Sequence, residues 1–139
     1  MARGGFSLVE LMVVFVLIGL LAGLVTVNVR GSLIKGRQNA ARAEISAIKN
    51  ALEQFYIDES RYPTNAEGLT ILTQTSGKRP QALLNSVPKD PWGRPYQYNS
   101  PGRNNEPYEV ISFGADGKEG GDGGDADVAS WNLKDRNEK

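Results

Sequence analysis

Carboxylates gather in one glycine-rich stretch near the C-terminus of the chain. Residues 116–127 contain one lysine, five glycines and five carboxylates, which are Asp116, Glu119, Asp122, Asp125 and Asp127. Hard cations such as calcium bind six to eight oxygen ligands, and a glycine-rich loop can wrap carbonyls and carboxylates around one ion. Composition alone fits a disordered acidic tail equally well. The EF-hand spacing is absent, and the glycine-rich repeat of β-rolls occurs once, whereas that fold needs stacked copies.

The residue inventory argues against several kinds of function. The chain has no histidine and no cysteine, which removes the usual zinc ligands, thiol nucleophiles and the commonest general base. An enzyme would have to use paired carboxylates, and a flexible open loop is a poor setting for tuning their pKa values. Basic and acidic residues balance at 16 each, and no basic cluster carries interleaved aromatics. We therefore expect neither an enzyme nor a nucleic-acid-binding protein.

Glu10 is the second residue whose setting indicates chemistry. It precedes residues 11–27, which carry no charge and are rich in Leu, Val and Ile. With residues 6–10 and 28–29, a helix here is long enough for a bilayer core of about 30 Å. A carboxylate inside such a helix costs roughly 2.5–3.5 kcal/mol, so it usually has a partner. If the chain is cut after Gly5, Phe6 gains an α-amino group one helical turn before Glu10, within reach in the same subunit or from a neighbour.

Two simpler interpretations of this N-terminus compete. A secretory signal peptide would have a longer basic region and a shorter apolar core, with a small-residue cleavage site after it. Ala22-Gly23 imitates such a site, but the apolar run continues to Val29. A plain signal anchor explains the run and leaves Glu10 unexplained.

The N-terminal segment Gly5-Phe6-Ser7-Leu8-Val9-Glu10 resembles the class III signal of type IV pilins and pseudopilins. The resemblance implies that a prepilin peptidase cuts between Gly5 and Phe6 and methylates the new N-terminal Phe6. It also implies that Glu10 is the carboxylate used in assembly, through the Phe6 amine of a neighbouring subunit.

The elements that must position these residues follow from periodicity. One apolar stripe has helical spacing and consists of Ala41, Ile45, Ile48, Leu52 and Phe55. No proline interrupts residues 6–62, so one helix is predicted from Phe6 to about Asp58, ended by the segment before Pro63. A short helix is predicted for residues 65–73, with Asn65 as a possible cap. Strands are predicted at residues 96–98 and 108–113, and around 128–133.

The predicted fold class is therefore α+β. A long N-terminal helix, half transmembrane and half amphipathic, packs on a small antiparallel sheet that is followed by the acidic loop. Aromatic residues at Trp92, Tyr96 and Tyr98 are interpreted as ordinary core.

Several segments, in this order, resemble the major pseudopilin family of type II secretion systems. They are Tyr62-Pro63-Thr64, Glu67-Gly68-Leu69, residues 88–93 (PKDPWG), Pro101-Gly102 and residues 112–117 (SFGADG) with Asp127 and Trp131. The resemblance implies a pilin-like fold and a structural subunit of the pseudopilus, a periplasmic filament that promotes protein export across the outer membrane. The alternative is a type IV pilus or competence-type fibre.

The same resemblance implies the domain boundaries of the chain and its binding partners. Residues 1–5 would be a cleaved leader, 6–29 the transmembrane and filament-core helix, and 30–139 a periplasmic domain, with a single pass through the bacterial inner membrane. Implied partners are further copies of the chain, prepilin peptidase, minor pseudopilins and the inner-membrane assembly platform.

The resemblance also favours calcium as the cofactor of the acidic loop. Asp116 and Asp127 best match the acidic ligands of the family, with the Phe113 backbone carbonyl as a further ligand. This loop ends in Asp125-Ala126-Asp127 rather than in adjacent aspartates, so Asp125 and Asp122 compete for the remaining position.

Overall fold

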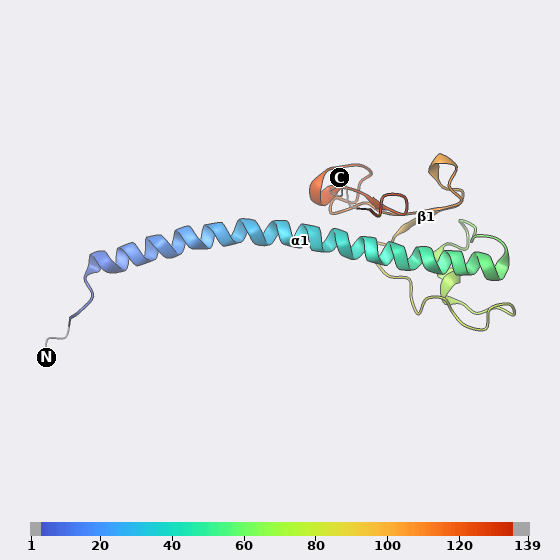
Figure 1. Ribbon diagram of the computed structural model, residues 1–139, viewed down its shortest axis with the longest axis horizontal. Coiled ribbons are helices and arrows are strands. Elements are labelled where there is room, and N and C mark those ends of the chain that lie inside the picture. The colour runs from blue at the N-terminus through green and yellow to red at the C-terminus, as the bar shows by residue number, and fades with distance from the viewer. Residues whose placement is uncertain (1–3, 135–139) are drawn as a thin grey trace. The chain divides into compact units, whose positions relative to one another are not determined.

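The computed structural model describes residues 4–134, and for residues 26–28 the backbone alone. The longest element is α1, a 52-residue helix from Leu8 to Glu59 (Figure 1). By its internal contacts the chain divides into two compact units, residues 1–35 and 36–139. The predicted domain boundaries at residues 5/6 and 29/30 stay predictions.

The described part of the first unit is the N-terminal stretch of α1 with residues 4–7 before it. By length and composition, α1 contains one stretch able to cross a membrane. Its large apolar side chains, from Leu8 to Val25, are exposed. The helix begins at Leu8 rather than at Phe6, because Ser7 takes the capping position described below.

The second unit is built on the amphipathic part of α1. Ala41, Ile45, Ile48 and Leu52 are fully buried, and Phe55 is 1% exposed. These side chains form one core with residues from the rest of the unit, which include Leu69, Leu72, Tyr96, Tyr108, Val110 and Val128. The predicted stripe is confirmed, and so is the core interpretation of Trp92, Tyr96 and Tyr98, which lie in or against this core.

The end of α1 lies within one residue of the predicted position. The helix stops at Glu59, before the Tyr62-Pro63 segment, because Ser60 adopts a left-handed conformation with φ 58°. The Ser60 amide still donates to the Tyr56 carbonyl at 2.8 Å. A single residue with positive φ turns the chain out of the helix here, which is the usual geometry of a helix C-terminus.

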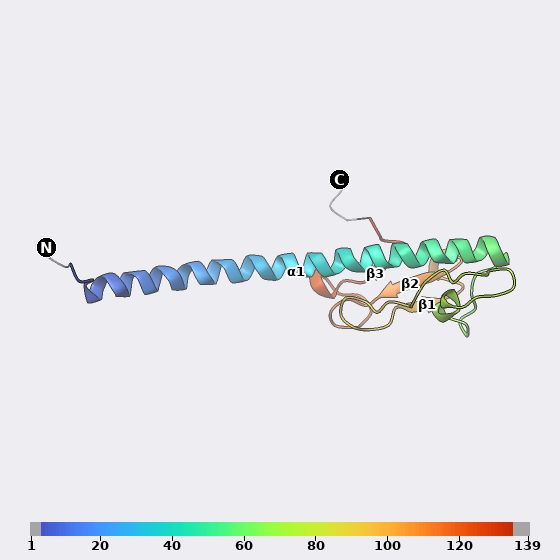
Figure 2. The same ribbon diagram turned by 90° about the horizontal axis from the view of Figure 1, so that it is seen from below.

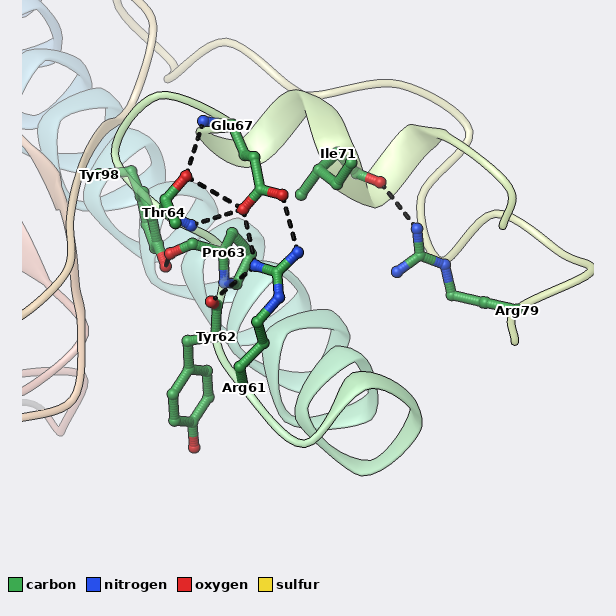
Figure 3. Close-up of polar contacts among 8 residues, drawn as sticks. All are labelled: Arg61, Tyr62, Pro63, Thr64, Glu67, Ile71, Arg79 and Tyr98. Atoms are coloured by element: carbon green, nitrogen blue, oxygen red, sulfur yellow. Dashed lines mark hydrogen bonds and ion pairs between the residues drawn. The ribbon is translucent and has the colours of Figure 1, made fainter. Parts of the chain in front are cut away.

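A tight turn leads from α1 into the 3₁₀ helix η1 (Leu69–Thr73) (Figure 3). The Thr64 amide donates to the Glu67 carboxylate at 2.7 Å, and the Glu67 amide donates to the Thr64 hydroxyl at 3.3 Å. This reciprocal pair is a capping box. Asn65, the predicted cap, instead accepts a hydrogen bond from the Ser100 amide at 2.7 Å. Thr64 therefore caps the turn, and Asn65 ties it to the strand region.

Figure 3 also shows how two arginines hold this corner. The Arg61 guanidinium donates two hydrogen bonds of 2.8 Å to the Glu67 carboxylate. Arg79 is 3% exposed and donates to the carbonyls of Ile71 at 3.0 Å and Gln74 at 2.8 Å, at the end of η1. Arg79 also lies over the Phe55 ring, 4.8 Å from its centroid.

Three short strands form an antiparallel sheet in the order β1-β2-β3 (Figure 2). They are β1 (Gln97–Asn99), β2 (Glu109–Ser112) and β3 (Val128–Ala129). Tyr98 pairs with Val110, and Ile111 pairs with Ala129. Two further 3₁₀ turns, η2 (Arg103–Asn105) and η3 (Gly123–Asp125), lie in the connections. The predicted α+β class is confirmed.

Glutamates of α1 tie the sheet region to the helix. The Tyr108 hydroxyl donates to Glu53 at 2.8 Å, and the Tyr62 hydroxyl donates to the same carboxylate at 3.0 Å. The Tyr96 hydroxyl donates to the Glu44 carboxylate. Burial, and then the bond to Glu53, raise the pKa of Tyr62 to about 12. Burial, reinforced by their glutamate partners, raises the pKa of Tyr96 and Tyr108 as well.

Candidate functional site

Glu10 forms a capping box at the start of α1. The Ser7 amide donates to the Glu10 carboxylate at 2.7 Å, and the Glu10 amide donates to the Ser7 hydroxyl at 3.2 Å. The Ser7 carbonyl accepts from the Leu11 amide at 3.3 Å. Ser7 is thus the N-cap of the helix, and a carboxylate in the first turn is favourable there. Ser7 was not among the predicted site residues, although the pattern Ser7-x-x-Glu10 is the usual signal for a capping box.

The residues on both sides of the predicted cleavage position are exposed to solvent. Gly5 and Phe6 precede the helix, and the Phe6 side chain is 84% exposed. No side chain at Gly5 shields the Gly5–Phe6 peptide bond, and an added Cβ would meet nothing within 4 Å. The structure therefore brings Gly5, Phe6 and Glu10 together at the start of one exposed apolar helix, while residues 1–3 of the predicted leader lie outside the described residues.

The acidic loop is anchored from a tight turn at residues 90–94. The Asp90 carboxylate is 4% exposed and accepts from the Trp92 amide at 3.1 Å and the Arg94 amide at 2.8 Å. Its other oxygen accepts from the Ser112 hydroxyl at 2.7 Å. Because Ser112 is the last residue of β2, Asp90 joins this turn to the strand from which the loop departs.

Arg94 reaches from that turn into the loop. Its guanidinium donates to the Gly114 carbonyl at 2.8 Å and to the Ala115 carbonyl at 2.9 Å. Gly117 packs against the same group: a Cβ at Gly117 would lie 2.7 Å from the Arg94 Cζ. With a φ of 68°, Gly117 also has a conformation that other residues rarely adopt.

The two ends of the loop meet at close range. The Ala115 amide donates to the Gly124 carbonyl at 3.0 Å. A Cβ at Gly114 would lie 2.6 Å from the Asp125 carbonyl oxygen, so only glycine permits this approach. The Gln38 side chain of α1 donates to the Gly123 carbonyl. The loop is thus a closed structure held by backbone contacts, and the alternative of a disordered tail does not describe it.

The carboxylates of the loop have different surroundings. Asp127 Oδ2 accepts from the Gly120 amide at 2.9 Å, whereas Asp127 Oδ1 is buried without a hydrogen-bond partner among the described residues. Asp116 accepts from the Lys118 amide at 3.0 Å, and Glu119 pairs with Arg103. Asp122 and Asp125 are exposed.

Within residues 4–134, no three acidic side chains converge closely enough to form a metal-binding group. The predicted ligand set of Asp116, Asp125, Asp127 and the Phe113 carbonyl, with Asp122 as the competitor, stays a prediction. The buried, unpartnered Asp127 Oδ1 is the one feature of this set that fits a cation ligand, because a buried carboxylate oxygen without a partner is costly.

Comparisons with known proteins match both parts of the chain. A family model for the prokaryotic N-terminal methylation motif matches residues 1–26, and a model for type II secretion system protein G matches residues 28–131. The type II secretion system core protein G of Vibrio cholerae is 42% identical over 137 residues, covering 94% of this chain and 93% of the relative. Core protein G of Pseudomonas aeruginosa is 40% identical over 136 residues, covering 93% and 95%.

A solved structure agrees. The crystal structure of the major pseudopilin from the type 2 secretion system of enterohaemorrhagic Escherichia coli matches with a TM-score of 0.60 and 26% identity, over 75% of this chain and 94% of that chain.

A methylation motif at the start of a long apolar helix, followed by a small α+β domain, defines a pseudopilin. The match over residues 28–131 identifies the particular family: the chain belongs to the type II secretion system protein G family. This membership implies processing by a prepilin peptidase and a pseudopilus as the setting, and it does not favour the type IV pilus alternative.

Proposed function

We propose that this protein is the major, non-catalytic subunit of a type II secretion pseudopilus, and that copies of it polymerise into a periplasmic filament. The observation that carries the proposal is Glu10, the one charged residue between Leu8 and Val29, on a helix whose apolar side chains are exposed. A helix of this kind has to be covered by lipid or by other helices. Bundled copies of α1 would cover it in the filament.

Processing would create the partner for Glu10. A prepilin peptidase would cut after Gly5 and methylate Phe6, leaving a cationic amine at the helix start. Support comes from the exposed Gly5–Phe6 segment and from the methylation motif over residues 1–26. Pairing between the Glu10 carboxylate and the Phe6 amine of a neighbouring copy would neutralise both charges within an apolar environment and fix the axial register.

We infer the cellular location from the same apolar helix and globular unit. The subunit would be stored in the inner membrane through residues 6–29, with residues 30–139 in the periplasm. It would leave the membrane at the assembly platform and meet minor pseudopilins in the fibre. The sequence contains no phosphate-binding loop, so the energy for extraction would come from a separate ATPase.

We further propose that the acidic loop binds one calcium ion. Asp116, Asp127 and the Phe113 carbonyl would hold it, with Asp125 or Asp122 completing the set. The buried Asp127 Oδ1 supports this, since a cation would satisfy it. The carbonyls of Gly114 and Ala115 already accept from Arg94. A bound cation would join the two ends of the loop and offset the repulsion among its carboxylates.

The filament proposal is tested by removing the Glu10 carboxylate. Glu10→Val keeps an apolar helix and deletes the partner of the amine, so we expect normal membrane insertion and loss of filaments. Glu106→Val is the matched control, because it removes an exposed carboxylate of the globular unit. Electron microscopy of assembled fibres and membrane fractionation give the two readouts. Normal filaments from Glu10→Val would overturn the proposed pairing.

A further inference from the structure

We propose that Arg94 is a positioning residue of the acidic loop: its guanidinium holds the backbone on both sides of Asp116 in the conformation that binds calcium. This inference rests on the proposed calcium binding. The loop carries five carboxylates against one lysine, so repulsion among the carboxylates would favour opening. Two arginines outside the loop bring positive charge to it: Arg103 pairs with Glu119, and Arg94 donates to the Gly114 and Ala115 carbonyls.

The contacts surround Asp116 in sequence. The guanidinium donates at 2.8 Å to the Gly114 carbonyl and at 2.9 Å to the Ala115 carbonyl, which belong to the two residues before Asp116. The residue after Asp116, Gly117, packs on the face of the same guanidinium. One planar group thus contacts three of the residues around Asp116, and the geometry suits an arginine fork better than a single ammonium.

Arg94 is itself fixed by buried groups. Its amide donates to the Asp90 carboxylate at 2.8 Å, and its carbonyl accepts from the Asp90 amide at 2.7 Å. Asp90 in turn holds the Ser112 hydroxyl at the end of β2. The start of the loop is therefore set by a chain of contacts that runs from Asp90 through Arg94 to the backbone at Asp116.

Two physical effects of Arg94 have opposite signs for calcium binding. As a positive charge beside the loop, it repels a divalent cation and weakens binding. As a brace that orders the loop, it lowers the entropy cost of binding and strengthens it. The proposal states that ordering dominates. Arg94→Ala, which removes both effects, should therefore bind calcium more weakly, whereas a purely electrostatic role predicts tighter binding.

The experiment uses the full mature chain in detergent micelles with Arg94→Ala and Arg94→Lys. Arg61→Lys is the control, because it replaces a forked arginine at Glu67, far from the loop in sequence. Hydrogen exchange in excess EDTA measures order at the Ala115 amide and its neighbours without metal. Calorimetric titration with calcium measures affinity.

We expect faster exchange across residues 114–126 in both Arg94 variants, wild-type exchange there in Arg61→Lys, and calcium affinity lowered about tenfold or more by either Arg94 change. Unchanged loop exchange in both Arg94 variants would overturn the inference. Faster exchange with unchanged or tighter calcium binding would overturn it as well. If the wild-type chain binds no calcium, the calcium proposal fails, and the exchange data alone decide whether Arg94 orders the loop.

Discussion

The same short motif, a hydroxyl residue followed three positions later by glutamate, occurs twice in this chain with different consequences. Ser7 and Glu10 cap a helix in an apolar segment, and Thr64 and Glu67 cap a turn on the surface of the globular unit. Glu67 has the Arg61 guanidinium beside it as well. Hydrogen bonds from Arg61, and then from the Thr64 amide, lower the pKa of Glu67 from its ordinary 4.5 to about 2.

This lowered pKa gives a prediction for acid stability. Because the folded state favours the charged form, the contribution of Glu67 is present above about pH 4.5 and is lost as the pH falls towards 2. Glu67→Gln should lower the free energy of unfolding by about 1 kcal/mol at pH 7, since the ion pair is partly exposed. The gap between variant and wild type should close on acidification.

Denaturant unfolding at pH 7 and at pH 2.5 measures that gap. Glu106→Gln is a suitable control, because this exposed surface change should stay within about 0.5 kcal/mol of wild type at pH 7. If the free energies of unfolding of Glu67→Gln and wild type differ as much at pH 2.5 as at pH 7, then Glu67 does not stabilise the protein through its charge.

At the scale of elements, α1 carries two patterns in one helix. From Leu8 to Val25 its described apolar side chains are exposed, whereas from Ala41 to Phe55 its large apolar residues form a narrow buried stripe. The first pattern suits lipid or other helices, and the second suits one side of a globular core. The stability of the second unit should therefore depend on a few stripe positions rather than on helix propensity.

Ile48 and Ile57 make a matched pair for testing this. Ile48 is fully buried and Ile57 is 71% exposed on the same helix. Ile48→Ala should lower the free energy of unfolding by about 2–5 kcal/mol through lost burial and a cavity. Ile57→Ala should change it by less than about 0.5 kcal/mol. Similar losses in both variants, measured by denaturant unfolding, would contradict the assignment of the core stripe.

The elements were predictable where periodicity or turn chemistry acts locally. The stripe from Ala41 to Phe55 and the two strands that contain Tyr98 and Val110 follow from patterns within a few residues. The end of α1 at Glu59 lies one residue beyond the predicted end at about Asp58, but the left-handed serine that ends the helix was not predictable. The Asp90–Ser112 bond was also not predictable, since it joins residues 22 positions apart and leaves no periodic signal.

For the candidate site, the sequence indicated the carboxylates themselves but not the residues that bind to them or hold them in place. Glu10 was identified by its apolar surroundings, and the acidic loop by its composition. Ser7 was within reach of motif reasoning but was not recognised. Arg94 could not be identified from the sequence, because an arginine that donates to backbone carbonyls 20 residues away leaves no signal in composition.

At the scale of the whole molecule, the calcium proposal predicts a stability that depends on metal. A ligand present at about 100 times its Kd stabilises the folded state by about 2.7 kcal/mol. Removing calcium with EDTA should therefore lower the Tm of the full chain in micelles by several degrees. Asp127→Asn should lose most of this difference, because it replaces the carboxylate whose Oδ1 lacks a partner with a neutral amide.

Thermal melts monitored by circular dichroism, with and without calcium, provide the measurement, and Asp58→Asn on α1 controls for a general loss of charge. A wild-type Tm that is the same in EDTA and in calcium would count against the site.

The capping box at Ser7 also bears on how a fibre holds together. Before assembly, the Glu10 carboxylate already has a donor in the Ser7 amide. The proposed pairing with the amine of another copy would then be an exchange of donors rather than the capture of a lone anion. The free energy of such an exchange is the difference between two satisfied states, and it is smaller than either interaction alone. If the proposed pairing sets the register, that register would be reversible, and other contacts between the helices would decide whether a subunit stays in the membrane or joins the filament.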